Sequence, residues 1–321
     1  MEEQRRVIAL GFFDGVHLGH GALLRRVAEV ARRLNAVPAA FTFDRHPESV
    51  IPGREPVSLI NSAIERGELM RRLYGIREVI MAHFDQTMMR MDWRDFVTKY
   101  LTVRGAVHLV AGHDFRFGYK GEGTARRLKD LCGGLGIGCD VIPKVEVDGI
   151  TVSSTYIRSL IGSGELEEAA RFLGHPHVLS GTVVHGKELG RTLGTPTANL
   201  TVPDGVLSPA FGVYAARVWI LPNCSDNHEP PGPRRLPVEG PYMAVTNVGM
   251  RPTVSDAGNV TVEPWILDFH GDLYGRNIRL ELYKRLRPER RFGSTDELRA
   301  AILQNAEETR QYFAAEECPP C

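Results

Sequence analysis

Hydrophobic residues in the first half of the chain occur in short runs that alternate with amphipathic segments. The runs are "RVIAL", "VPAAFTF", "REVIMAHF" and "AVHLVAG". Between the first two, residues 21–34 repeat apolar side chains at helical spacing, namely Leu23, Leu24, Val27, Val30, Ala31 and Leu34. This alternation predicts an α/β domain in which crossover helices connect the strands of a parallel sheet.

The pattern changes near residue 176. Five strand-like runs follow, separated by turn residues instead of helices: "HVLSGTVVHG", "FGVYAARVWIL", "PYMAVTNVG", "NVTVEPWILDF" and "NIRLELYKRL". They predict a compact antiparallel β-barrel, and Ser294 with Glu297 forms a capping-box pattern for a final helix. The Pro-rich stretch 223–240 is typical of a long surface loop.

The length of 321 residues exceeds what one hydrophobic core usually serves. We therefore expect two domains, 1–175 and 176–321. Lys plus Arg and Asp plus Glu are equal at 39 each, so no overall basic field would attract nucleic acid. No apolar run approaches the ~18 residues of a membrane span.

The first residues lack the pattern of a secretory signal, so we expect a cytoplasmic protein. The five cysteines are odd in number and scattered, which argues against a disulfide framework. Cys318 and Cys321 form a CxxC without a second pair to complete a zinc site, and we interpret them as a loose tail. The expected partners are small molecules, without nucleic acid or membrane, and a homo-oligomer stays open.

"GFFDGVHLGH", residues 11–20, lies where the first strand should become the first helix. Such a loop offers unpaired backbone N–H groups and the positive end of a helix dipole, which together suit phosphate. His17 and His20 are three residues apart, so both imidazoles can donate to the same anion. A zinc site would need a third ligand. The structural alternative is that both histidines only cap the helix.

The segment "SSTYIR", residues 153–158, suggests a second phosphate clamp. Ser153, Ser154 and Thr155 can cap a helix, while Arg158, one turn on, points its guanidinium at the same anion. A plain N-cap followed by a surface arginine is the alternative.

The stretch 11–20 resembles the G-x-F-D-G-x-H-x-G-H signature of the bacterial FAD synthetase family, within the HxGH nucleotidyltransferase superfamily. Three further segments resemble motifs of that family: "FTFDRHP", in which Arg45 replaces a proline, "AGHDFRFG" and "SSTYIR". The resemblance implies a Rossmann-like fold that transfers AMP from ATP to FMN. It implies ATP contacts from Gly11, Phe12, Asp14, Gly15, His17, His20, Asp114, Ser154, Thr155 and Arg158, and a flavin pocket formed by Phe43, His46, Phe115 and Phe117.

Adenylyl transfer to FMN uses a phosphate oxygen that is already anionic, so the reaction needs no general base. Positioning and charge neutralisation suffice. We therefore expect His17, His20 and Arg158 to act as electrostatic stabilisers, with Mg²⁺ bridging phosphate oxygens.

The barrel half contains a second glycine-rich segment, residues 181–200. Its start fits G-x-x-x-x-G-K, but Glu188 takes the position that a P-loop reserves for Ser or Thr, so we reject a P-loop. A flexible cationic loop able to wrap phosphates is favoured, and a Gly-rich hairpin is the alternative. Its residues are Gly186, Lys187, Gly190, Arg191 and Gly194.

"PTAN" follows this loop, and Thr197 and Asn199 alternate on one face of an extended strand. Their oxygen atoms are hard ligands of the kind that Mg²⁺ prefers. The stretch resembles the riboflavin kinase motif G-R-x-L-G-F-P-T-A-N, with Thr195 in place of the phenylalanine. "TNVGMRPT", "VEPWILDFHGDLYG" and "KRLRPERRF" resemble further motifs of that family. The resemblance implies flavin contacts from Asn247, Arg251, Glu263 and Arg287.

Phosphorylation of riboflavin must activate a neutral hydroxyl, a reaction that benefits from a base. Glu263 lies in an otherwise apolar strand, where a carboxylate is costly to bury unless it lines a site. The resemblance assigns Glu263 the base role, and a salt-bridged strand residue is the alternative.

From residue 6 to about residue 313 the chain resembles the bifunctional riboflavin kinase/FAD synthetase family. The resemblance implies that the second domain makes FMN from riboflavin and that the first converts FMN to FAD, each with ATP and Mg²⁺. Two alternatives stay open: an HxGH adenylyltransferase for another phosphorylated acceptor, and a flavin-binding regulator without activity.

Overall fold

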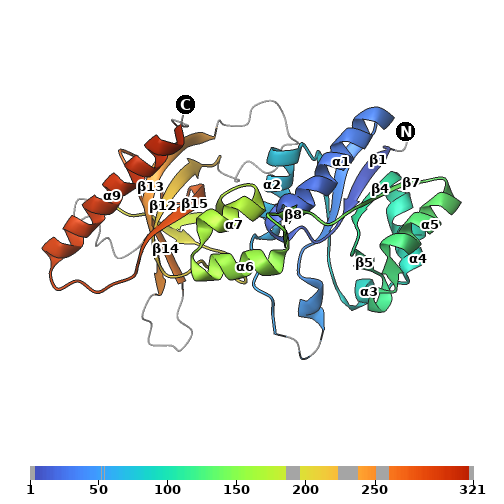
Figure 1. Cartoon of the computed structure of the whole chain (residues 1–321), viewed down its shortest axis with the longest axis horizontal. Coiled ribbons are helices and arrows are strands. Elements are labelled where there is room, and N and C mark those ends of the chain that lie inside the picture. Colours follow the sequence, from blue (N-terminus) through green and yellow to red (C-terminus); the bar gives the residue numbers. More distant parts are fainter. Residues whose placement is uncertain are drawn as a thin grey trace. The chain divides into compact units, whose positions relative to one another are not determined.

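The computed structural model describes residues 4–51, 53, 55–185, 196–222, 238–250 and 260–317. These residues form two compact units (Figure 1). The first contains the described residues through Ile157 together with Phe172–Gly174, and the second contains Arg158–Arg171 and the described residues from His175 onward. The predicted order of an α/β unit followed by an antiparallel barrel and a C-terminal helix is confirmed.

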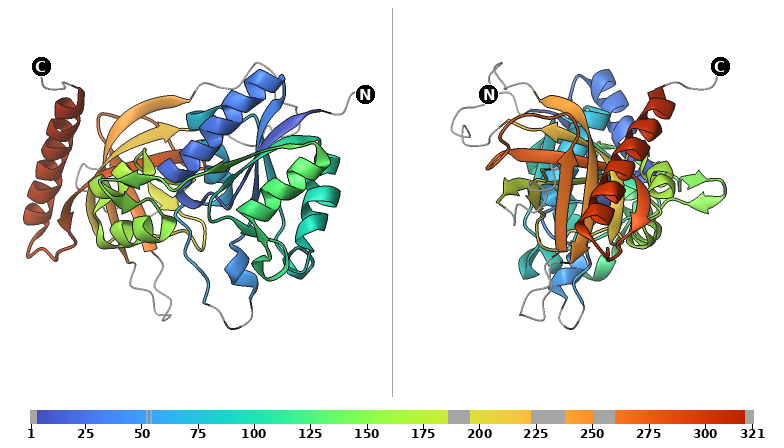
Figure 2. Two further views of the ribbon diagram at one scale, coloured as in Figure 1. Left: turned by 45° about the vertical axis from the view of Figure 1, so that its right-hand side comes forward. Right: turned by 90° about the vertical axis from the view of Figure 1, so that its left-hand side faces the viewer.

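A five-stranded parallel sheet forms the centre of the first unit (Figures 1 and 2). Its strands are β1 (Arg6–Leu10), β2 (Val37–Phe43), β3 (Glu78–Ala82), β4 (Ala106–Gly112) and β7 (Gly138–Ile142). Their order across the sheet is β3-β2-β1-β4-β7. The chain therefore builds outward from β1 in one direction and then returns to add β4 on the other side. Ligands of such sheets bind beyond the carboxyl ends of the strands where the order reverses, here β1 and β4.

Helices and short hairpins connect these strands. The helices are α1 (Leu18–Leu34), α2 (Ala63–Tyr74), α3 (Gln86–Met89), α4 (Trp93–Asp95), which continues into a π-helical turn over Phe96–Leu101, and α5 (Ala125–Leu135). The 3-10 turns are Asp14–Val16, Pro47–Val50, Thr102–Arg104 and Tyr119–Gly121. Two hairpins pair β5 (Arg116–Phe117) with β6 (Gly123–Thr124) and β8 (Glu146–Val147) with β9 (Ile150–Thr151).

Both faces of the central strands are covered. Ile8 and Leu10 of β1 pack in a core with Phe96, Leu101 and Leu128, while α1 packs against β1, β2 and β4. The strands are therefore apolar at odd and even positions alike, which is typical of buried parallel sheets. This explains why their sequences are continuous hydrophobic runs.

Six antiparallel strands close into a barrel in the second unit. They are β10 (His177–Val184), β11 (Asn199–Thr201), β12 (Gly212–Ile220), β13 (Glu239–Met250), β14 (Val260–Ile266) and β15 (Asn277–Pro288), in the order β10-β11-β14-β13-β12-β15. The pairing of β10 with β15 completes the circle, so no sheet edge is left open.

Among the described residues, helices α6 (Ser154–Ser163) and α7 (Leu166–Leu173) precede the barrel strands and α9 (Thr295–Glu317) follows them. The last one packs against β12 and β13 of its own unit (Figure 1). The side-chain oxygen of Ser294 accepts a hydrogen bond from the Glu297 N–H at 3.2 Å, as the capping pattern predicts. The Glu297 carboxylate, however, accepts from the N–H of Gly293 at 2.9 Å.

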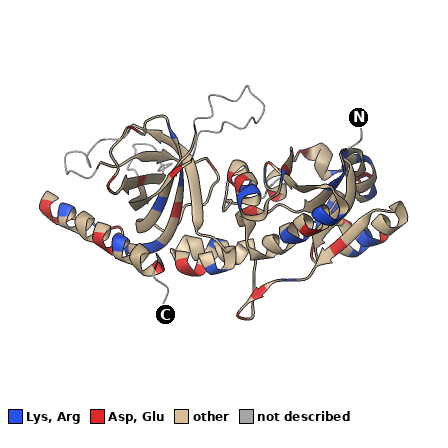
Figure 3. Cartoon of the chain, turned by 90° about the horizontal axis from the view of Figure 1, so that it is seen from above, with Lys and Arg blue, Asp and Glu red and all other residues tan. Residues whose placement is uncertain are grey.

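Charges of both signs occur on both units (Figure 3). Within the described ranges, no helix has the length and the apolar composition needed to cross a membrane. Cys132 and Cys139 are free thiols, and the other three cysteines lie outside the described residues.

Candidate functional sites

The loop after β1 has an unfavourable backbone conformation. Phe13, Gly15 and Val16 have φ angles of 60°, 80° and 43°. A Cβ atom on Gly15 would lie 2.8 Å from the Cδ1 atom of Ile60, so only glycine fits there without displacement. Val16 is β-branched, and positive φ is an outlier for such a residue. Strained backbone of this kind persists where the surrounding structure holds it, often at binding sites.

Asp14 anchors this loop. Its side chain is 2% exposed, and its Oδ1 atom accepts hydrogen bonds from the backbone N–H groups of Ile60 at 2.9 Å and Asn61 at 3.4 Å. The carbonyl oxygen of Asp14 accepts from the Ser154 hydroxyl at 2.9 Å. The backbone donors offset the cost of burying the carboxylate. Asp14 thus connects the loop to the segment before α2 and to the start of α6.

His17 and His20 lie together at the start of α1. The Nδ1 atom of His17 accepts from the backbone N–H of His20 at 3.2 Å, so His17 caps the helix. In a neutral imidazole, an accepting Nδ1 leaves the proton on Nε2. The two rings are stacked, with centroids 3.6 Å apart and planes 13° apart. Capping the helix therefore leaves His17 with an N–H donor on Nε2.

His20 is electrically neutral in this environment. Its Nδ1 atom is buried without a hydrogen-bond partner among the described residues, and its ring contacts Phe13 edge-on at 5.2 Å. Burial, then the neighbouring His17, then the charge of Arg66 lower the pKa of His20 well below its ordinary value. At neutral pH His20 can therefore offer a hydrogen bond but not a full positive charge.

The serines of the predicted second phosphate clamp, residues 153–158, have two different roles. Ser153 caps α6 by accepting from the Tyr156 N–H at 3.3 Å, and Ser154 donates to the β1 loop as described. Thr155 is exposed. Arg158, one turn farther along α6, begins the second compact unit.

The remaining predicted residues of the first unit lie near the carboxyl ends of the strands. Gly11 directly follows β1, and its N–H donates to the carbonyl of Phe41 at 3.3 Å. His46 follows β2, where its ring contacts Phe12 edge-on at 4.8 Å. Asp114 follows β4 with 82% of its side chain exposed.

The predicted flavin-binding phenylalanines differ in exposure. Phe43, at the end of β2, is half-buried and contacts Phe84 edge-on at 4.7 Å. Phe115 stacks on Phe117 with centroids 5.2 Å apart. Phe117 is 8% exposed and belongs to the hydrophobic core, where it packs against Phe96. Phe43 and Phe115 therefore have more surface to offer a ligand than Phe117.

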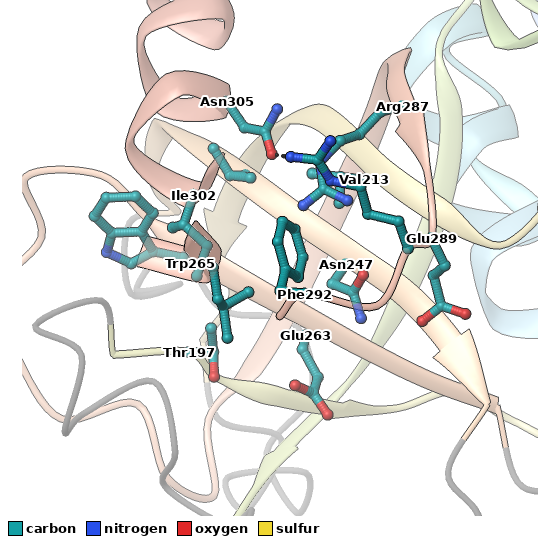
Figure 4. Close-up of a pocket in the computed structure, with 13 residues that line it drawn as sticks. Thr197, Val213, Asn247, Glu263, Trp265, Arg287, Glu289, Phe292, Ile302 and Asn305 are labelled. Atoms are coloured by element: carbon teal, nitrogen blue, oxygen red, sulfur yellow. Dashed lines mark hydrogen bonds between the residues drawn. The ribbon is translucent and has the colours of Figure 1, made fainter. Parts of the chain in front are cut away.

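A cavity of about 380 Å³ lies in the second unit between barrel strands and α9 (Figure 4). The residues that line it are Thr197, Val213, Val245, Asn247, Glu263, Trp265, Arg287, Glu289, Arg290, Phe292, Leu298, Ile302 and Asn305. Six of these residues are apolar or aromatic and seven are polar or charged, so the cavity suits a small molecule that has both an apolar and a polar part.

Glu263 enters the cavity because of the alternation along β14. Val262, Pro264 and Ile266 are buried, whereas Glu263 and Trp265 are half-buried and line the cavity. Asn247 of β13 is the direct partner of Glu263 in the antiparallel ladder. Directly opposed residues have neighbouring side chains, so an amide lies beside the carboxylate (Figure 4).

Arg287 of β15 is the ladder partner of Val213, which in turn faces Asn247, so it lies at the other end of the same row of residues. Its Nε atom donates to the side-chain oxygen of Asn305 at 3.0 Å (Figure 4). The guanidinium groups of Arg287 and Arg290 lie 5.3 and 4.6 Å from the centre of the Phe292 ring. Burial, followed by the charge of Arg290, lowers the pKa of Arg287. The ring of Phe292 is thus held by two cations at the edge of the cavity.

Four of the residues predicted from the sequence come together in this cavity: Thr197, Asn247, Glu263 and Arg287. Asn199 lies on β11 and is not among the described residues that line it. The other predictions fall outside the described residues, and these are Gly186, Lys187, Gly190, Arg191, Gly194 and Arg251.

Sequence reasoning missed the apolar wall of the cavity. Leu298, Ile302 and Asn305 are spaced by four and three residues in α9, so they share one helix face. That spacing is visible in the sequence and could have indicated a buried face. Trp265 and Phe292 carry no comparable signal.

Comparison with known proteins places the chain in a family. Residues 1–156 match the family model described as FAD synthetase, and residues 173–313 match the one described as riboflavin kinase. A relative from Listeria monocytogenes serovar 1/2a, named bifunctional riboflavin kinase/FMN adenylyltransferase, is 34% identical over 96% of this chain and 93% of its own length. The chain belongs to the bifunctional riboflavin kinase/FMN adenylyltransferase family.

Another family member and one solved structure also match nearly the whole chain. The family member from Escherichia coli K12 is 34% identical over 96% of this chain and 92% of its own length. A crystal structure described as a macrolide-efflux protein from Streptococcus pneumoniae superposes with a TM-score of 0.80 at 30% identity, covering 97% of this chain and 95% of that one. The family resemblance predicted from the motifs is confirmed.

Proposed function

We infer that this chain catalyses both reactions of its family. The second unit transfers the γ-phosphoryl group of ATP to riboflavin and yields FMN and ADP. The first unit transfers AMP from ATP to FMN and yields FAD and pyrophosphate. The observation that carries this inference is the likeness to family members over more than nine-tenths of both chains, with the two family models in the same order.

In the kinase reaction we propose that Glu263 is the general base. The 5′-hydroxyl oxygen of riboflavin forms a bond to the γ-phosphorus, the bond from that phosphorus to the β–γ bridging oxygen breaks, and the hydroxyl proton passes to the Glu263 carboxylate. The position of Glu263 in the cavity, beside Asn247, supports this role. Asn247 can donate a hydrogen bond that keeps either the carboxylate or the ribityl chain in place.

The cavity suits a flavin on one side and a polar chain on the other. Trp265, Phe292, Leu298 and Ile302 supply apolar surface, and aromatic rings of ligands stack well on such side chains. We propose that the isoalloxazine ring contacts this wall. The ribityl chain then extends toward Glu263.

In the adenylyl transfer, a phosphate oxygen of FMN forms a bond to the α-phosphorus of ATP, and the bond from that phosphorus to the bridging oxygen of pyrophosphate breaks. No proton has to move. We propose that the N–H groups of the β1 loop and the start of α1 bind the phosphates, together with the Nε2–H of His17. The neutral ring of His20 supports His17 by stacking.

Magnesium fits the oxygen donors of the kinase site. Thr197 and Asn199 offer a hydroxyl and an amide oxygen, and the described residues contain no group of three His, Cys, Asp or Glu side chains that could hold a metal ion by itself. Mg²⁺ typically binds few protein ligands and several phosphate and water oxygens. We propose that Thr197 and Asn199 hold it. When bound, Mg²⁺ neutralises negative charge on the phosphates.

Chromatography of flavins tests the proposal. We expect purified protein with riboflavin and MgATP to form FMN first and FAD later. FMN without FAD would refute the assignment of the first unit and would favour another phosphorylated acceptor. Absence of any conversion would favour a flavin-binding regulator without activity.

A further inference from the structure

Arg66 of α2 is the largest side chain of the described residues that is fully buried, with an exposure of 0%. Burial lowers its pKa to about 10, while the charges of Asp14 and Asp44 oppose that shift, so the side chain is cationic at neutral pH. A buried cation is costly unless hydrogen bonds compensate the loss of its hydration. The hydrogen bonds that Arg66 makes are therefore the feature to explain.

The hydrogen bonds of Arg66 converge on the ends of two strands. Its Nη1 atom donates to the carbonyl oxygen of Phe12 and, at 3.1 Å, to the hydroxyl of Thr42. Its Nη2 atom donates to the carbonyl oxygen of Phe43 at 2.8 Å. The Thr42 hydroxyl itself donates to the Phe12 carbonyl at 2.8 Å. The guanidinium also lies 4.2 Å from the centre of the Phe12 ring.

These contacts hold the residue at which the strained turn begins. Phe12 immediately precedes Phe13, which is the first of the three residues of this turn with positive φ; the others are Gly15 and Val16. On the other side of the turn, the Asp14 carboxylate accepts from the N–H groups of Ile60 and Asn61, which lead into α2. The segment 60–66 therefore grips the turn at two points, one on each side of Phe13.

Displacement of this turn would reach the histidine pair. Phe13 contacts the ring of His20 at 5.2 Å, and His20 stacks on His17. Arg66 has an exposure of 0% and donates to protein oxygens through both terminal nitrogens, so its guanidinium is closed off from a nucleotide. Its action on a nucleotide must pass through the loop.

We propose that Arg66 is a positioning residue for adenylyl transfer, which holds the Phe12–Val16 turn in the conformation that presents His17 to the nucleotide. This inference rests on the proposed function of the first unit. Misplacement of reacting groups by about 1 Å can slow a reaction about 100-fold. Loss of Arg66 should therefore lower kcat of FAD formation and leave the kinase reaction of the same chain unchanged.

The test compares Arg66→Met with Arg71→Met in the full-length protein. Arg71 lies on the same helix and is exposed, so its substitution removes a charge without touching the turn. We expect Arg66→Met to lower kcat for FMN-to-FAD conversion about 100-fold, with KM for FMN changed much less and riboflavin phosphorylation kept within about threefold. Arg71→Met should match the wild type in both reactions.

Two further variants separate positioning from folding. Arg66→Lys retains the charge and can bond some of the same oxygens, so it should restore part of the kcat. Thr42→Val removes the second donor to the Phe12 carbonyl and one acceptor of Arg66 Nη1, and it should lower kcat about 10-fold. If Arg66→Met does not fold, these two variants test whether Arg66 positions the turn.

The inference is overturned if folded Arg66→Met forms FAD at a rate close to that of the wild type. It is also overturned if Arg66→Lys and Thr42→Val both retain full kcat, or if FMN and FAD formation decline together. A wild-type protein that forms no FAD would instead refute the proposed function of the first unit, and this inference with it.

Discussion

His177 makes the stability of the barrel dependent on pH. It begins β10, is 1% exposed, and both of its ring nitrogens are buried without a hydrogen-bond partner among the described residues. Burial, and to a lesser extent the neighbouring His175, lowers its pKa from 6.5 to about 3. In the unfolded chain the ring recovers its ordinary pKa. The unfolded state therefore binds more protons than the folded state between pH 6.5 and pH 3.

This difference in bound protons determines how the free energy of unfolding depends on pH. Stability is unaffected above the unfolded pKa of 6.5, falls as the pH drops through that value, and stops falling near pH 3. At pH 5, which is about 1.5 pH units below the unfolded pKa, His177 lowers the free energy of unfolding by about 2 kcal/mol. The full penalty near pH 3 is about 5 kcal/mol.

The assay measures the free energy of unfolding of the barrel by urea at pH 7.5 and pH 5. The chain has three tryptophans, and Trp219 and Trp265 both lie in the second unit, so in a Trp93→Phe background the fluorescence reports on the barrel. We expect wild-type His177 to lose about 2 kcal/mol more than His177→Leu between the two pH values. His270→Leu, at an exposed position of the same unit, should behave like the wild type.

The comparison uses the difference between variants, so other titrating groups cancel. Equal losses of stability in the wild type and in His177→Leu would refute the reasoning. They would mean that the folded barrel protonates His177 as readily as the unfolded chain does.

Three further predictions concern the two sites. Glu263→Gln should lower FMN formation at least about 100-fold and leave FMN-to-FAD conversion unchanged in steady-state kinetics, and loss of both in a folded variant would contradict the division between units. Asn305→Ala removes the acceptor of the Arg287 Nε–H, so KM for riboflavin should rise about 10-fold, and an unchanged KM would exclude this contact from binding. Gly15→Ala meets both positive φ and a neighbouring side chain, so it should lower FAD formation and the melting temperature of the first unit more than Gly149→Ala, which has the same type of φ but open space. If Gly15→Ala and Gly149→Ala had equal effects, the contact between residue 15 and Ile60 would be unimportant.

Local patterns were sufficient for most of the elements. The runs at β1, β2 and β4 are continuous and apolar because both faces of these inner strands are covered, and the barrel strands carry turn residues at their ends. The run at β3 is also visible in the sequence, although this edge strand is mostly half-buried. β7, Gly138–Ile142, was missed, because this edge strand is only half-buried at all five positions and its sequence "GCDVI" lacks a long apolar run. A strand with little burial leaves little hydrophobic signal.

The position of the β1 loop was also visible in the sequence, since glycines and the change from strand to helix are local features. The roles of its neighbours were not. Arg66 resembles Arg71 as a helical arginine in sequence, yet one is fully buried and the other is exposed. The pKa of His20 depends on burial and on the charge of Arg66, which is 46 residues away in the chain.

The amino-acid sequence by itself determined the periodicity of helices and strands, their caps, and the spacing of residues within each motif, because these depend on neighbours a few positions apart. The tertiary structure alone decided that Phe292 and α9 close the cavity over Glu263, and that a buried arginine holds the turn before His17. Burial and pairing arise between segments that are distant in sequence, and no local pattern records which of them will meet.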